Sequence, residues 1–243
     1  MTGPPRGVRR TPASARRERQ NRSLYRRGGK RAVDLLISLP AVIVLTPVMA
    51  TIALLVRHDL GPPVLFRQAR PGLNGQIFEI LKFRSMTGAR DSEGHALPDD
   101  SQDAYAAARA GSRQTPFGIF LRRTSLDELP ELFNVIRGQM SLVGPRPLLV
   151  EYLGRYSAEQ ARRHEVRPGI TGWAQVHGRQ AVSYEHRFEL DVWYVDNVTL
   201  WLDLKIMALT AVEVFRGKGV HEPGYATGTE FMGSQPTDGP HVG

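Results

Sequence analysis

The chain of 243 residues is 41% hydrophobic, which suffices for a buried core, and it contains no cysteine. The missing cysteines exclude disulfide bonds, thiolate metal sites and cysteine nucleophiles. The net charge of +8 arises in residues 1–31, which hold eleven Arg or Lys against one acid, so the rest of the chain is not a basic domain.

Residues 1–29 form a basic leader, rich in Arg, Ser, Pro and Gly and poor in apolar groups. This composition predicts disorder. The leader is either a solvated extension or a segment drawn to anionic lipid headgroups, at ~1 kcal/mol per basic residue near the surface. We do not expect nucleic-acid binding, because no aromatic residues or reader motif accompany the charge.

Residues 32–56 are apolar apart from Asp34. A run of this length can cross a bilayer core, which takes ~20 residues, and the alternative is a buried helix of a soluble protein. Pro40 and Pro47 favour a kink, and basic residues flank both ends, as on the cytoplasmic side of a membrane. We therefore predict a re-entrant helix–break–helix over 30–58. Asp34 is expected in the headgroup zone or paired with Lys30.

Two strands are predicted at 64–68 and 77–83, joined by the turn residues 71–75, as in a β-hairpin. Strand alternation places Lys82 and Arg84 on one face. These two cations are either solvated or facing a polyanion. Residues 87–115 are predicted as a polar loop with one short helix, and 116–123 as another short helix with proline in its first turn.

Asp127 and Glu128 precede a helix predicted over 131–137, which Gly138 suits as an end. Two interpretations stay open at this point. Ser125-x-x-Glu128 matches a capping box, whereas a helix N-terminus also favours carboxylates and can hold a phosphate.

Residues 144–147 form a rigid Gly-Pro-Arg-Pro loop that presents Arg146. It is either a plain surface turn or a stiff support for a guanidinium aimed at phosphate or carboxylate. Helices are predicted at 184–196 and 200–215 from their near-helical apolar spacing. Trp193, Tyr194 and Trp201 belong either to a lipid interface or to the core. Residues 219–243 are predicted as a flexible tail.

Together these stretches resemble the bacterial sugar transferases, the monotopic phosphoglycosyl transferases that act on polyprenyl phosphate. The matching segments follow in one order over residues 30–218: Lys30-Arg31-x-x-Asp34 with the apolar run through Thr46-Pro47, then residues 61–68 (GPPVLFRQ), 82–86 (KFRSM), 122–130 (RRTSLDELP), 140–147 (MSLVGPRP) and 167–173 (RPGITGW). Several long motifs in a fixed order are far more specific than any one of them.

The resemblance implies a mainly α fold with a small β-hairpin. It implies a re-entrant membrane helix bent at Thr46-Pro47 and amphipathic interfacial helices around a cytosolic catalytic domain, here 59–218. Such a protein lies monotopically on the cytoplasmic face of the bacterial inner membrane. No further membrane helix is visible in the sequence, so we expect the minimal catalytic form, and a homo-oligomer is an open alternative.

The family's reaction transfers a sugar-1-phosphate from a UDP-sugar to polyprenyl (undecaprenyl) phosphate and releases UMP, as the first membrane step of a surface glycan pathway. The resemblance makes Asp127 the nucleophile of a covalent intermediate and a ligand of the required Mg²⁺, with Glu128 as its partner. The cations that chemistry needs around a diphosphate are expected from Lys82, Arg84, Arg122 and Arg146. Gln139 stands where the family usually has an acid. A membrane-anchored scaffold without catalysis is the competing hypothesis.

Overall fold

The computed structural model describes residues 24–87, 115–177, 183–215, 231 and 233. The predicted leader up to residue 23 and the predicted helix within 87–115 lie outside these ranges. The helices and short helical turns are η1 (Tyr25–Gly29), α2 (Lys30–Leu60), η2 (Leu73–Gly75), α4 (Pro116–Arg123), η3 (Leu126–Glu128), α5 (Glu131–Ile136), η4 (Val150–Arg155), α6 (Ala158–Ala161), η5 (Arg162–Glu165), α7 (Trp173–His177), α8 (Tyr184–Asn197) and α9 (Leu200–Phe215). The strands are β1 (Leu65–Pro71), β2 (Ile77–Phe83), β3 (Ser141–Val143) and β4 (Gly169–Thr171). The predicted mainly helical fold with one hairpin is confirmed.

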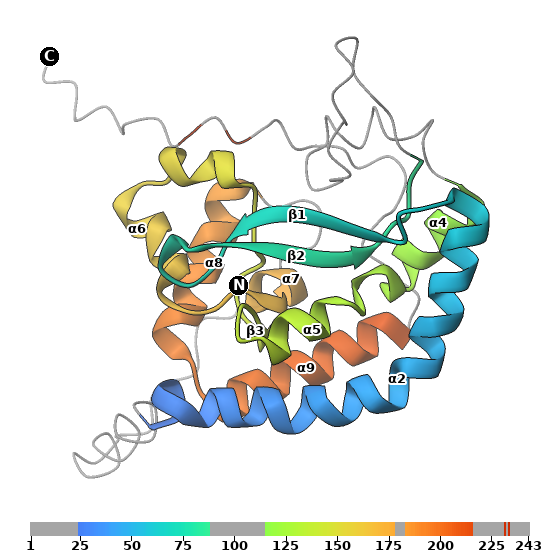
Figure 1. The fold of residues 1–243 in the computed structure, drawn as a ribbon. Coiled ribbons are helices and arrows are strands. Elements are labelled where there is room, and N and C mark those ends of the chain that lie inside the picture. The colour runs from blue at the N-terminus through green and yellow to red at the C-terminus, as the bar shows by residue number, and fades with distance from the viewer. Residues whose placement is uncertain (1–23, 88–114, 178–182, 216–230, 232, 234–243) are drawn as a thin grey trace, which may run out of the picture.

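Helix α2 is a single continuous helix that contains Pro40 and Pro47. It runs along the lower edge of the molecule and then turns upward (Figure 1). The expected helix–break–helix is thus one helix that changes direction. Beside the second proline, the Thr46 hydroxyl donates to the Val42 carbonyl (2.7 Å) and the Thr51 hydroxyl to the Pro47 carbonyl (3.0 Å). Pro47 lacks the N–H that would bond the carbonyl four residues earlier, and hydroxyls that bond the i−4 carbonyl also favour bending, so a bend is expected here.

The surface of α2 carries many exposed apolar side chains, which are Leu36, Ile37, Leu39, Ile43, Val44, Val48, Leu54 and Leu55. By length and composition, the helical segment 25–60 is long and apolar enough to cross a membrane. Its other side packs into the protein through Met49, Ile52 and Val56. The helix therefore joins an apolar outer surface to the core.

The polar residues at the start of α2 fasten it to the rest of the chain. The Asp34 carboxylate accepts hydrogen bonds from the Ser141 hydroxyl and the Leu142 amide, both at 3.0 Å. The Arg31 guanidinium donates to the Ile136 carbonyl at the end of α5 (2.7 Å). Asp34 was expected in the headgroup zone or on Lys30. It is buried against β3, because that strand supplies two donors to a carboxylate that has left water.

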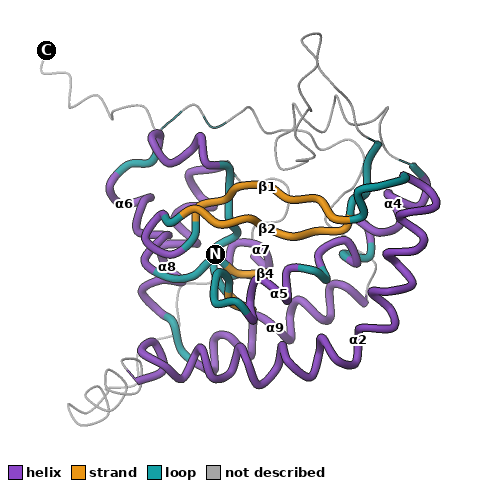
Figure 2. The backbone as a smooth tube through the Cα atoms, viewed as in Figure 1, coloured by secondary structure: helices purple, strands orange, loops and turns teal. Residues whose placement is uncertain are grey.

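The hairpin β1–β2 is antiparallel, with Leu65 opposite Phe83 and Pro71 opposite Ile77. It lies on one side of the molecule, with α2, α5 and α9 below it in the view of Figures 1 and 2. Helix α5 packs against both α2 and β2. At the α5–β2 contact, the Asn134 side chain accepts from the Leu81 amide (3.0 Å) and donates to the Glu79 carbonyl (2.7 Å). The hairpin register and α5 are thereby fixed to each other.

A second sheet, missed by the sequence prediction, pairs β3 with β4 in parallel. Strands of three residues carry too little alternation to be read from a sequence. The glycines beside them allow a very close backbone approach, since a Cβ on Gly169 would lie 2.0 Å from the Gly144 nitrogen. This contact brings the loop 144–147 against the loop 167–173, two segments that are well separated in the chain.

The predicted helices at 184–196 and 200–215 are confirmed as α8 and α9. Tyr194 is fully buried, and its hydroxyl donates to Asp203 (2.6 Å), so this residue belongs to the core. Trp193 and Trp201 are exposed, at 43% and 77%. Within the predicted tail, Phe231 is buried against other aromatic rings, so this part of 219–243 is packed on the protein.

Candidate active site

The Asp127–Glu128 pair lies in the short turn η3, between α4 and α5. Ser125 precedes it in the left-handed region (φ 55°), and its side chain makes no capping hydrogen bond. Pro130 is the N-cap of α5. The capping-box interpretation is therefore wrong: the Glu128 side chain reaches two cations from other elements, because long-range ion pairs outweigh the local hydrogen bond.

Glu128 is held between Lys82 of β2 and Arg146 of the rigid loop. Its Oε1 lies 3.0 Å from the Lys82 Nζ and 2.5 Å from the Arg146 Nη2. Burial by itself would raise the pKa of this carboxyl, but the charges and hydrogen bonds of Arg146 and Lys82 outweigh it and lower the pKa well below its usual range. Glu128 is thus a fixed anion that orders both cations.

Asp127 is 8% exposed. Burial raises the pKa of this carboxyl most, and the charge of Glu128 raises it further, while Lys82, Arg122 and Arg146 act in the opposite direction. The net result is a pKa of about 6. At neutral pH Asp127 is therefore ionised and close to its titration, which suits a carboxylate nucleophile.

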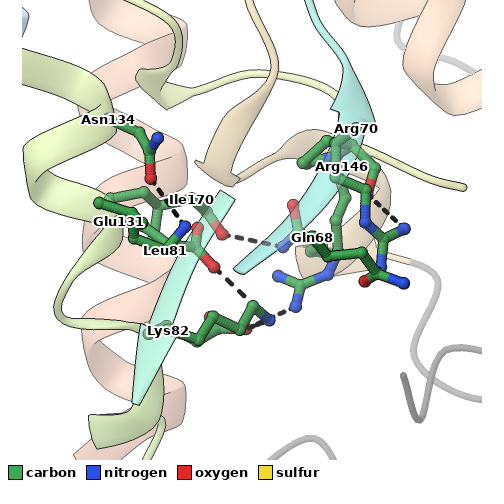
Figure 3. A network of polar contacts seen from close by, with 11 residues as sticks. Gln68, Arg70, Leu81, Lys82, Glu131, Asn134, Arg146 and Ile170 are labelled. Atoms are coloured by element: carbon green, nitrogen blue, oxygen red, sulfur yellow. Dashed lines mark hydrogen bonds and ion pairs between the residues drawn. The ribbon is translucent and has the colours of Figure 1, made fainter. Parts of the chain in front are cut away.

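Glu131 joins the site from the first turn of α5, and sequence reasoning missed it. It is fully buried, with Oε1 3.5 Å from the Lys82 Nζ. Figure 3 shows the two side chains pointing toward each other. Within the described part of the chain, neither carboxyl oxygen has a hydrogen-bond partner. Burial and then Glu128 raise its pKa to about 8. The spacing of Glu128 and Glu131, one helical turn apart, was the signal available in the sequence.

Of the predicted phosphate-binding residues, Lys82 and Arg146 meet at Glu128, and Arg122 is buried where its charge lowers the pKa of Asp127. Arg84 lies elsewhere. Its guanidinium donates to the carbonyls of Leu60, Gly61 (2.7 Å) and Pro62 (3.0 Å) at the end of α2. These contacts satisfy helix-terminal carbonyls, and a phosphate-binding role for Arg84 stays a prediction.

Gln139 fills the position where an acid was expected. Its Oε1 accepts from the Asn134 amide (2.8 Å), the side chain that also bonds β2. A carboxylate oxygen could accept the same hydrogen bond. Among the described residues, no group of three or more His, Asp or Glu has the arrangement of a metal centre.

The comparison with known proteins is decisive for the family. Residues 25–217 match the family model described as Bacterial sugar transferase. The chain belongs to this family.

Three similar relatives follow, and the second and third have a named activity. The chain is 51% identical over 187 residues to the uncharacterized sugar transferase EpsL of Bacillus subtilis, covering 77% of this chain and 87% of that protein. It is 42% identical over 193 residues to the UDP-glucose:undecaprenyl-phosphate glucose-1-phosphate transferase of Xanthomonas campestris, covering 76% of this chain and 38% of the relative. It is 38% identical over 198 residues to the undecaprenyl-phosphate galactose phosphotransferase of Salmonella typhimurium, covering 79% and 41%. The chain thus spans about two fifths of these two named enzymes.

Proposed function

We propose that this chain transfers a sugar-1-phosphate from a UDP-sugar to polyprenyl (undecaprenyl) phosphate and releases UMP. The observation that carries the proposal is the buried Asp127 carboxylate beside Glu128, which holds two cations. The names of the relatives, which specify undecaprenyl phosphate, add independent support.

In the first half-reaction, a carboxylate oxygen of Asp127 attacks the phosphorus that bears the sugar. A new P–O bond forms to Asp127 as the bond to the UMP oxygen breaks, and UMP leaves with that bonding pair. The product is an aspartyl phospho-sugar. The raised pKa of Asp127 reflects a desolvated and hence more basic carboxylate, although it remains ionised at pH 7.

The cations of the site provide electrostatic stabilisation for this phosphoryl transfer. Lys82 and Arg146 converge on one carboxylate oxygen of Glu128, beside Asp127. Preorganised positive charge stabilises the oxygens of a transferring phosphoryl group without reorganisation during the reaction. Glu128 is therefore proposed to keep both cations in place. Arg122 adds a third positive charge close to Asp127.

We propose Mg²⁺ as the cofactor. The donor set fits, because Mg²⁺ is commonly bound by one or two carboxylates together with substrate phosphates. Asp127 would hold the ion with one oxygen, since Glu128 already accepts from two cations. When bound, the ion would neutralise charge on the diphosphate.

In the second half-reaction, an oxygen of polyprenyl phosphate attacks the same phosphorus. The P–O bond to Asp127 breaks, the carboxylate is restored, and the product is a polyprenyl diphospho-sugar. Both steps use one site in ping-pong order. This transfer would be the first membrane step of a surface glycan pathway.

We further propose that the protein is monotopic on the cytoplasmic face of the inner membrane, with α2 re-entrant. The exposed apolar residues of α2 support this arrangement, as do Leu200, Trp201 and Leu204 of α9. A cysteine introduced at Arg57 should react only with a reagent on the cytoplasmic side, and labelling only from the outside would contradict the topology.

The decisive experiment measures UMP release from a panel of UDP-sugars mixed with undecaprenyl phosphate and Mg²⁺. We expect release with one or a few donors, and a mass increase of one sugar phosphate on acid-quenched wild-type protein but not on Asp127→Asn. No UMP from any donor would favour the scaffold hypothesis. Full activity of Asp127→Asn would disprove the assigned nucleophile.

A further inference from the structure

Behind the active site lies a buried ion pair that the proposed chemistry does not use. Arg163 of η5 and Asp191 of α8 are each 2% exposed. The Arg163 Nε and Nη2 both donate to the Asp191 Oδ2, at 3.1 and 2.7 Å. Burying such a pair costs desolvation energy that an apolar pair would avoid. The pair therefore calls for an explanation beyond stability.

The same guanidinium binds the backbone of the active-site loop. Its Nη2 donates to the carbonyl of Arg146 (2.8 Å), and its Nη1 donates to the Tyr156 hydroxyl (3.2 Å). All three guanidinium nitrogens are thus engaged, and one of them fixes the residue whose side chain reaches Glu128. Arg70 of β1 donates to the next carbonyl, that of Pro147 (3.4 Å), and lies beside Arg146 in Figure 3.

Aromatic rings enclose the buried guanidinium. The Arg163 Cζ lies 5.7 Å from the ring centre of Tyr156 and 5.4 Å from that of Phe188. Phe231, C-terminal to α9, packs on both rings, with centroid distances of 5.9 Å and 5.0 Å. Phe231, remote in sequence, thus packs against the two rings that contact the residue holding the Arg146 backbone.

We propose that Arg163, locked by Asp191, is a positioning residue that sets where the Arg146 guanidinium lies in the active site, and that Phe231 completes this support. The inference rests on the proposed function, because it assigns Arg146 to phosphate binding. A displacement of ~1 Å in a group that must meet a transferring phosphoryl can cost ~10²-fold in rate. Saturated hydrogen bonding behind the loop prevents such a displacement.

The chain offers a matched control one residue away. Arg162 lies at the surface, where it pairs with Asp196 of α8, Glu159 and Glu165. Among the described residues, none of these ion pairs involves the 144–147 loop. Arg163→Lys keeps the positive charge but loses the fork that serves Asp191 and the Arg146 carbonyl together. Arg162→Lys makes the same chemical change at the surface.

The experiment measures UMP release for Arg163→Lys and Arg162→Lys, each in the wild-type and the Arg146→Lys backgrounds. We expect Arg163→Lys to lower kcat/KM by ~10–100-fold, Arg162→Lys to change it less than about twofold, and Arg163→Lys to add nothing in the Arg146→Lys background. Phe231→Ala should show a smaller loss with the same dependence on Arg146. Equal losses in both backgrounds, or full activity of Arg163→Lys, would overturn the proposal.

Two further measurements keep the test decisive. If Arg163→Lys does not fold, Tyr156→Phe removes one hydrogen bond from the same guanidinium. This variant should give a milder loss of activity that again vanishes in the Arg146→Lys background; a loss that persists there refutes the inference.

If the wild type releases no UMP, the proposed function fails, and amide exchange reports on the geometry alone. Exchange at the Gly144 and Arg146 amides, the two that this proline-containing loop has, should then be faster in Arg163→Lys than in Arg162→Lys, and equal rates would refute the positioning role.

Discussion

Two clusters of charged side chains, one partly and one fully buried, meet at Arg146 and differ in how their polar groups are satisfied. In the active-site cluster, Glu128 pairs with Lys82 and Arg146, Glu131 pairs with Lys82, and the charges of both cations act on Asp127. The Glu131 oxygens have no hydrogen-bond partner among the described residues. In the support cluster of Arg163, Asp191 and Tyr156, every nitrogen of the guanidinium donates to a partner. The active-site cluster thus keeps a buried carboxyl without a hydrogen bond and carboxyls with shifted pKa values, as functional sites do, whereas the support cluster is saturated.

The largest expected effect concerns Asp127. Asp127→Asn should lower transfer by at least ~10⁴-fold, the range for loss of a catalytic nucleophile. The same change should raise the thermal unfolding midpoint at pH 7. The folded carboxyl has a pKa raised above its ordinary value, so its ionisation destabilises the fold above that ordinary value, and Asn carries no charge. A midpoint that falls at pH 7 would contradict this view of the active-site cluster.

Removing the carboxylate of the support cluster should lower stability, whereas removing the charge of Asp127 should raise it. Asp191→Ala leaves the Arg163 charge buried without its carboxylate, which typically destabilises a fold by ~3–5 kcal/mol. Chemical denaturation measures this loss. Asp196→Ala, which breaks the neighbouring surface pair, should leave the denaturation midpoint unchanged. Equal effects of the two substitutions would remove the distinction between a buried support and a surface pair.

Glu131→Gln tests the active-site carboxyl that has no hydrogen-bond partner, through the pH dependence of stability. The Glu131 carboxyl has a pKa of about 8 in the fold and an ordinary value of 4.5, so the unfolded chain binds fewer protons between these values and stability falls as pH rises. Glutamine does not titrate, so the variant lacks this fall in stability with rising pH. The stability gained over wild type should be small at pH 4 and grow towards pH 8, by at most about 1.4 kcal/mol per pH unit. A gain independent of pH would show that the pKa of Glu131 is the same in the folded and the unfolded chain, and would contradict the raised pKa.

The smallest effect is expected at the neutral contact between α5 and β2. Gln139→Glu restores the acid usual in the family and keeps an oxygen that can accept from Asn134. Stability should change by no more than ~1 kcal/mol, the range for one hydrogen bond, and activity should stay within a few-fold. A large gain in activity would instead give that position a direct role in the reaction.

Local sequence patterns predicted much of the fold. The apolar run with Pro40 and Pro47, the hairpin and the helices α8 and α9 follow from periodicity and turn residues, which act over a few positions. The motifs also brought Asp127, Glu128 and Arg146 into one candidate site. Glu131 was missed, because a buried acid and an exposed helix-terminal acid look alike in sequence.

What the sequence by itself determined is the set of parts: a long bent apolar helix, a hairpin, two adjacent acids and a rigid arginine loop. Only the tertiary structure decided their partners. It placed Asp34 on β3, Arg84 on the end of α2, and Arg163 behind Arg146. The physical reason is range: secondary structure depends on neighbours along the chain, whereas the partner of a buried charge is chosen by whichever distant element excludes water around it.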